Sequence, residues 1–335
     1  MLRDSNNDSP VAATPLVQNN YSLVFSIAGK KLGQCSVAGY LILGNVPLLP
    51  ESDPAYIALL EQLMADRSVE SVQMMGVPNC SRFWKFLEEV EKSTRAYIFY
   101  KPEQPSHRYY WIELPSSFEE YAKKFNSKER YNLKRELSLL QKQAGIPLEL
   151  MRVSNADQVA TFLANSRSVA EKSWQRHLVG LEVNQSGTRQ ELLESMARQG
   201  ILRSYQLKAG GKVCAYAVGF QFGGVFYFYE TAYDDLYAKC SPGKCLVNLI
   251  LHDLFQADPP RIFYFGPGDA SYKKWFANRS DDEVTLLILK NTVANRAKVL
   301  AHRTFRRCVE MSKAVKSALR KPTTAPGGLG AHSDA

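Results

Sequence analysis

The stretch YETAYDDLYAKCSPGKCLVNLILHDLF, residues 229–255, decides how the rest of the chain is interpreted. An aromatic run typical of a β-strand leads into a loop, and the loop leads into an apolar helix. Ser241 suits the N-cap of this helix, and Pro242 suits its first position because proline lacks the amide hydrogen that a helix start cannot pair. Gly243 follows with no side chain. The pattern predicts a strand, a loop and a helix whose first turn is open to a ligand.

The first turn of this helix has the chemistry of an anion site. We expect the backbone amides of Gly243, Lys244 and Cys245 to point outward at the positive end of the helix dipole. Such an end binds phosphate or pyrophosphate, and Gly243 lets the ligand approach the backbone closely. The alternative is that Ser241–Gly243 only starts a helix. The stretch is not a Walker A loop, which requires GxxxxGK[ST].

A second stretch, FYFGPGDASYKKWFANR at residues 263–279, carries polar groups suited to transfer chemistry. A strand ends at Phe265, two glycines bend the chain, and a short helix then presents Asp269, Tyr272 and Lys273. The phenol of Tyr272 can protonate a leaving thiolate, and Lys273 can hold an anionic group of a donor or substrate. The alternative is an aromatic turn that packs on the sheet.

The second half of the chain alternates strand and helix patterns in a defined order. Working outward from the quoted stretches, we predict strands at 147–153, 202–208, 212–222, 225–232, 261–265 and 283–289, and helices at 155–173, 188–198, 242–255 and 271–277. The resulting order, β-α-α-β-β-β-α-β-α-β, resembles that of a GNAT-type acyltransferase domain.

The first half shows the same mixture of elements. We predict strands at 21–28, 34–43, 71–76, 96–100 and 109–114, and helices at 54–65 and 82–91. A capping-box pattern at Ser116–Glu119 and an amphipathic helix at 128–144 form a helical connector. The fold class that follows is α+β with a mixed sheet.

Several sequence blocks together resemble one family. Tyr233-Asp234 followed by Ser241-Pro-Gly243, and then Phe265-x-x-Gly-Asp-x-x-Tyr-Lys-x-Trp275, resemble the BioF2-like/CelD-like acetyltransferase family. This family belongs to the GNAT superfamily and is related to the FemAB-type aminoacyltransferases. The resemblance covers roughly residues 110–290, and Trp111–Phe118 and Lys172–Trp174 also fit it. One position departs from the family, because Tyr264 stands where an acid usually precedes the Phe-x-x-Gly block.

The resemblance implies acyl transfer from a thioester, acetyl-CoA or another acyl-CoA, to an amine or hydroxyl without a covalent enzyme intermediate. It places the CoA pyrophosphate at Ser241–Cys245. It implies a base, for which Glu230 is our candidate and Asp234 the alternative, and a tyrosine that protonates the sulfur.

Three further residues are candidates for binding a small-molecule acceptor, either a saccharide or an amine. They are Trp174, Tyr233 and Asp269. The alternative for Trp174 is a buried tryptophan in the connector.

The resemblance also implies a tandem arrangement of two GNAT-like halves. We expect a disordered lead-in at 1–20, a degenerate GNAT-like half at 21–115, the helical connector at 116–145, the acyltransferase domain at 146–290, a basic terminal helix at 291–321 and a disordered tail at 322–335.

The net charge of +9 over 335 residues is concentrated near the end of the sequence. Residues 290–321 contain ten Lys or Arg and one acid, so the rest of the chain is balanced, which argues against a broad nucleic-acid footprint. The terminal helix has a mostly apolar stripe that runs from Val293 through Leu300 and Met311 to Leu319. We expect this stripe to dock on the body of the protein or on a partner, with weak contact to an anionic surface as the alternative.

Composition excludes several classes of protein. No apolar run is long enough to span a bilayer, and no secretory signal is visible, so we expect a cytoplasmic protein. The six cysteines form no CxxC pair, and the histidines lack the spacing of metal ligands, so we predict reduced thiols and no metal site. Two other functions remain open: a FemAB-like aminoacyltransferase that uses aminoacyl-tRNA, and a non-catalytic GNAT-fold protein that binds through its basic C-terminal helix.

Overall fold

The computed structural model describes residues 2–3, 10–12, 14–27, 30–102, 107–173 and 187–319, and of these it gives residues 2–3, 10–12, 107 and 313–319 as backbone alone. The chain divides into two compact units. The first comprises Met1–Ser106 and Glu283–Ala335, and the second comprises His107–Asp282. Among the described residues, no helix is long and apolar enough to cross a membrane.

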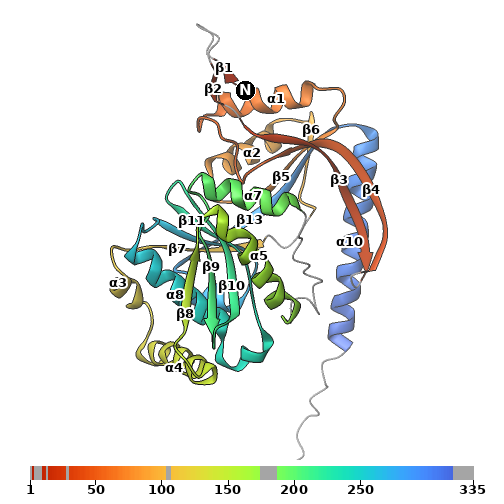
Figure 1. Cartoon of the computed structure of the whole chain (residues 1–335). Helices are drawn as coiled ribbons and strands as arrows, with labels where there is room; N and C mark the ends of the chain where they lie inside the picture. The colour runs from red at the N-terminus through yellow and green to blue at the C-terminus, as the bar shows by residue number, and fades with distance from the viewer. Residues whose placement is uncertain are drawn as a thin grey trace, which may run out of the picture. The chain divides into compact units, whose positions relative to one another are not determined.

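The first unit is built around one mixed sheet with the order β3-β4-β5-β13-β6 (Figure 1). Its strands are β3 (Leu16–Ile27), β4 (Lys30–Ile42), β5 (Ser71–Pro78), β6 (Tyr97–Tyr100) and β13 (Arg279–Lys290). Its helices are α1 (Asp53–Ala65), α2 (Arg82–Ser93) and α10 (Val293–Leu319), and a small pair of strands precedes them, β1 (Leu2–Arg3) and β2 (Pro10–Ala12).

Strand β13 shows how this sheet separates two apolar layers. Its side chains alternate, so that Leu286 and Ile288 pack with α1 and α2 on one face. Leu287 and Leu289 pack on the other face with Val299 of α10. From Glu283 onward this strand pairs with β5 and β6, so the strand predicted to close the second half belongs to the first unit.

Two expectations about the first unit differ from the structure. Strand β3 begins at Leu16 instead of Tyr21, because residues of the expected disordered lead-in continue the antiparallel ladder as far as the Leu16–Ile42 pair. Helix α10 forms as predicted, but its apolar stripe is exposed at Val293, Leu300 and Met311, so these residues do not dock on the body of the protein, and docking on a partner stays a prediction. The packed face carries Asn295, Val299 and His302 instead, because the His302 imidazole is anchored by a 2.6 Å hydrogen bond to Tyr100.

The second unit has helices on both faces of a sheet with the order β7-β12-β11-β10-β9-β8 (Figure 1). Its strands are β7 (His107–Glu113), β8 (Glu149–Val153), β9 (Ser204–Ala209), β10 (Lys212–Phe222), β11 (Val225–Tyr233) and β12 (Ile262–Pro267). Its helices are α3 (Phe118–Ala122), α4 (Ser127–Ala144), α5 (Ala156–Glu171), α7 (Gly187–Arg198), α8 (Pro242–Gln256) and α9 (Ser271–Phe276), with a 3₁₀ turn η1 (Asp235–Cys240).

Strand β10 is buried on both sides, as its apolar composition predicts. Ala215 and Ala217 face the cluster that holds α8, and Tyr216 and Val218 face the cluster that holds α5 and α7. Strand β7, which we had assigned to the first half, pairs with β12 and so begins this unit. The predicted α+β class with a mixed sheet is confirmed.

Gly219 of β10 provides a test of this packing. A Cβ atom at this position would lie 2.6 Å from the Phe226 ring and from the Arg203 carbonyl oxygen. We expect Gly219→Ala to lower the free energy of unfolding by about 1–3 kcal/mol, measured by urea denaturation. The matched variant Gly33→Ala in β4, whose Cβ would meet nothing within 4 Å, is expected to change it far less. Equal destabilisation by the two variants would contradict the packing described.

Candidate active site

The site arises where β11 and β12 stop pairing. Their parallel ladder extends only over Val225–Tyr227 and Ile262–Tyr264. Beyond it, β11 stays paired with β10 as far as Tyr233, with a bulge that leaves Tyr229 as the extra residue. The backbone groups on the β12 side of the last part of β11 are therefore available to a ligand.

A cavity of about 710 Å³ occupies this opening. Its walls come from the end of β11 (Phe228–Tyr233), the start of α8, and the start of α9 with the residue before it (Ala270–Lys273). The structure thus brings together seven residues singled out in the sequence: Glu230, Tyr233, Ser241, Gly243, Lys244, Tyr272 and Lys273.

The start of α8 differs in detail from the expected N-cap. Ser241 has a left-handed backbone conformation, with φ of 51°, and its side chain makes no capping hydrogen bond. Its hydroxyl lies 3.3 Å from a carboxylate oxygen of Glu136 in α4. The amides of Lys244 and Cys245 donate to the Ser241 carbonyl, so they do not point outward as we expected. Among the described residues, only Gly243 of these three has an amide with no backbone acceptor.

The backbone amide of Cys245, predicted to face the anion, instead donates to the Ser241 carbonyl. The side chain of Cys245 is fully buried, its thiol contacts the Cys240 carbonyl, and the residue does not line the cavity. Burial raises the pKa of this thiol to about 12. Gly243, in contrast, lines the cavity, and a Cβ there would lie 3.5 Å from the Tyr233 ring.

Lys244 lies in the first turn of α8 and lines the cavity, and an ion pair with Glu136 partly compensates its positive charge. Its ammonium lies 3.6 Å from the Glu136 carboxylate and over the ring of Trp275. Glu136 therefore contacts both Ser241 and Lys244. An acid at this position opposes the binding of an anion.

Tyr272 lies in the cavity wall with its ring edge against Phe265. Burial raises the pKa of its phenol to about 12, so the hydroxyl keeps its proton at neutral pH. Lys273 also lines the cavity, but its ammonium donates to the Pro267 carbonyl at 2.6 Å. It thus holds the bend between β12 and α9.

Asp269 does not line the cavity. Its carboxylate accepts hydrogen bonds from Lys274 at 2.8 Å and from the Tyr110 hydroxyl at 2.5 Å. These hydrogen bonds hold the pKa of Asp269 below its usual value, and the bond from Lys274 has the largest effect. Asp269, which we predict to bind the acceptor, therefore links the loop before α9 to Tyr110 of β7.

The two candidate bases occupy different surroundings. Glu230 lines the cavity and accepts hydrogen bonds from Tyr216 and Arg189, each at 2.8 Å. Asp234 lies outside the cavity wall, where it caps η1 through the Leu236 amide and pairs with Lys172 at 3.6 Å. The geometry therefore disfavours the alternative base.

Sequence reasoning missed Arg189 and Glu136, because each was one of several charges on a helix. Trp174, the third predicted acceptor-binding residue, lies outside the described residues. In the part of the chain that the structure describes, no group of three His, Cys, Asp or Glu side chains is placed to hold a metal ion.

Comparison with known proteins gives one family match that covers part of the chain. Residues 127–274 match the family model of the acetyltransferase (GNAT) domain. The match includes all three walls of the cavity. No curated protein matches the chain in sequence.

Solved structures show the same fold at low identity. FemX is 9% identical, with 82% of this chain and 89% of that chain covered at a TM-score of 0.54. The C-terminal domain of a putative lysylphosphatidylglycerol synthetase from Agrobacterium fabrum is 12% identical, with 80% and 84% covered at 0.51. L-PGS from Bacillus licheniformis is 13% identical, with 85% and 88% covered at 0.50. At these identities the likeness concerns the fold.

The pairing of Glu136 with Lys244 leads to a prediction about anion binding at the start of α8. Glu136→Gln removes a negative charge within a few ångströms of α8, so inorganic pyrophosphate is expected to bind about three- to tenfold more tightly. Isothermal titration calorimetry measures the change. The control is Glu149→Gln, which removes a carboxylate paired with Lys208 on β9, outside the cavity wall. Unchanged pyrophosphate affinity in a folded Glu136→Gln variant contradicts an anion site at this helix start.

Proposed function

We propose that the chain is an acyltransferase that moves an acetyl or other acyl group from acyl-CoA to an amine or hydroxyl acceptor. The single observation that carries this proposal is the cavity between the separated ends of β11 and β12. It combines an unpaired strand edge, a glycine amide at a helix start and a protonated tyrosine. The BioF2-like/CelD-like resemblance of the same blocks supports it.

The donor is expected to lie along β11. Its pantetheine amides would pair with the backbone of Phe228–Tyr233, as an added strand does. Its pyrophosphate would accept a hydrogen bond from the Gly243 amide and take the Lys244 ammonium from Glu136. The thioester would then lie between β11 and Tyr272.

Transfer requires one bond exchange and two proton movements. The acceptor nitrogen or oxygen attacks the thioester carbonyl, the new bond to carbon forms, and the carbon–sulfur bond breaks. Glu230 takes the acceptor proton, since a carboxylate has lone pairs beyond the two that bond Tyr216 and Arg189. Tyr272 gives its proton to the departing thiolate.

This reaction fits a cytoplasmic protein. The six cysteines form no CxxC pair, and in this proposal they are free thiols in a reducing compartment. The acceptor is a small molecule, a saccharide or an amine, and the first unit is a degenerate copy of the same fold in this proposal.

A FemAB-like transfer from aminoacyl-tRNA is the second candidate. It is favoured by one observation, the Glu136 carboxylate that opposes a pyrophosphate at α8. Thermal shift with acetyl-CoA, compared with an aminoacyl-tRNA, separates the two. A folded protein whose melting temperature changes with neither ligand favours the third candidate, a non-catalytic GNAT-fold protein that binds through its basic C-terminal helix.

Gly243→Val tests donor binding. The added side chain would fill the space at the start of α8, where a Cβ already approaches Tyr233. We expect the dissociation constant for acetyl-CoA to rise at least ~10-fold, about 1.4 kcal/mol, in calorimetric titration. Gly33→Val in β4 serves as the control and is expected to leave the affinity unchanged. An unaltered affinity in a folded Gly243→Val protein refutes the donor site.

Tyr272→Phe tests proton donation to sulfur. Only the hydroxyl is lost, so turnover is expected to fall by about 10²–10⁴-fold while the melting temperature changes little. The rate with acetyl-CoA and an accepted amine is measured as released thiol. Tyr227→Phe, on the paired part of β11, is expected to retain full turnover. If the Tyr272→Phe variant keeps wild-type turnover at every pH tested, the hydroxyl does not donate a proton and Tyr272 serves only in packing.

A further inference from the structure

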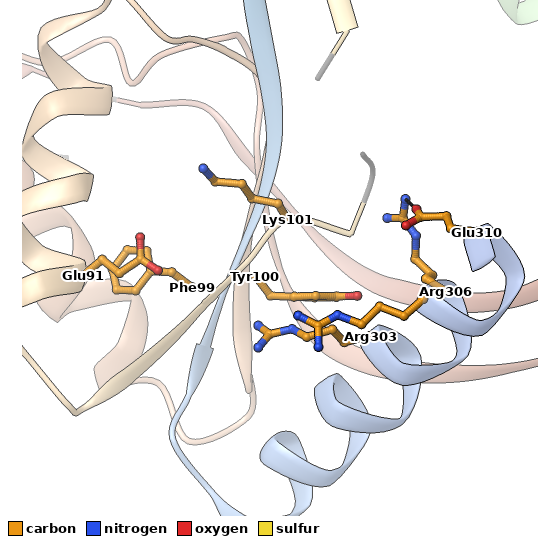
Figure 2. A pocket seen from close by; sticks show the side chains of 8 residues that line it. Glu91, Phe99, Tyr100, Lys101, Arg303, Arg306 and Glu310 are labelled. Carbon is orange, nitrogen blue, oxygen red and sulfur yellow. Dashed lines mark ion pairs between the residues drawn. The ribbon is translucent and has the colours of Figure 1, made fainter. Parts of the chain in front are cut away.

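The first unit holds a basic pocket that the proposed transfer does not use (Figure 2). Its volume is about 350 Å³, and it lies between the end of β6 and one face of α10. Three arginines of α10 line it, Arg303, Arg306 and Arg307, together with Lys101, which follows β6. The spacing of the arginines, i, i+3 and i+4, places them on one side of the helix.

Two of the positively charged side chains that line this pocket contact aromatic rings. The Arg303 guanidinium lies 5.7 Å from the centre of the Tyr100 ring, and Figure 2 shows the two groups side by side. Tyr100 is itself fixed, since it is buried and its hydroxyl bonds His302 at 2.6 Å. Lys101 lies 4.5 Å from the centre of the Trp84 ring. These contacts reduce the entropy that the cations lose when a ligand binds.

The positive charge of the pocket is only partly compensated. Arg306 pairs with Glu310 at 3.6 Å and donates to the Pro102 carbonyl. For Arg303, Arg307 and Lys101, no carboxylate of the described residues lies within 4.0 Å. Among the described residues that line the pocket, which include Glu91 and Glu310, four cations face two anions. A ligand with two negative charges matches the excess.

We propose that this pocket binds a phosphate monoester in its dianionic form. Guanidinium groups present paired N–H donors that match phosphate oxygens, and three of them line this pocket together with one ammonium. The volume leaves space beyond the phosphate for an organic part, which would rest against Phe99. The phosphate belongs to a soluble metabolite or to a lipid headgroup, and the experiment distinguishes these sources.

The test uses the full chain and two probes. Glycerol 3-phosphate is titrated calorimetrically, and sedimentation is measured with phosphatidylcholine vesicles with and without phosphatidic acid. At a pH above the second phosphate pKa of about 6, we expect the protein to bind at least one of the two probes. The double variant Arg303→Gln/Arg307→Gln is expected to weaken it at least about tenfold, and added salt is expected to weaken it as well.

The matched control is Arg296→Gln, which lies on the same helix and contacts Asn291 outside the pocket. It is expected to retain wild-type affinity. Binding of glycerol 3-phosphate supports a soluble ligand, and binding only to vesicles with phosphatidic acid supports a lipid headgroup. Failure of both probes, or equal binding by the double variant, overturns the proposal. Neither result depends on acetyl-CoA binding in the second unit.

Discussion

The site depends on the point at which β11 leaves β12. The parallel ladder ends at Tyr227 and Tyr264, while the antiparallel ladder to β10 continues to Tyr233. A central strand that loses one neighbour exposes hydrogen-bonding groups inside the unit, where burial without partners is costly. The cavity of about 710 Å³ follows from this geometry.

The elements around the opening are held by contacts between distant parts of the chain. Lys124 of the α3–α4 segment donates to the carbonyls of Trp275, Phe276 and Ala277, which end α9. The Tyr121 hydroxyl donates to Phe276 as well. Helix α9 is short, so these bonds satisfy its terminal carbonyls and fix the position of its side chains. The preorganisation of the cavity therefore rests on the helical segment that precedes β8.

Much of this arrangement was predictable from local patterns. Hydrophobic periodicity and turn residues predicted the strands and helices of the second unit. The aromatic run before Ser241 predicted the strand, loop and helix that border the cavity. The details that failed depend on partners far along the sequence. Ser241 does not cap α8 because its hydroxyl contacts Glu136, 105 residues earlier, and Glu230 meets Arg189 across 41 residues. No local pattern reports such contacts, and none shows that β13 returns to the first unit.

The central claim is that the free edge of β11 receives the donor, and amide hydrogen exchange tests it most directly. The amide hydrogen exchange of the 335-residue chain is measured with and without saturating acetyl-CoA. The account predicts slower exchange in Phe228–Tyr233 and at Gly243, with β8 and β9 unchanged. Unchanged exchange along β11 in protein that binds acetyl-CoA would contradict it, because the donor would then lie elsewhere.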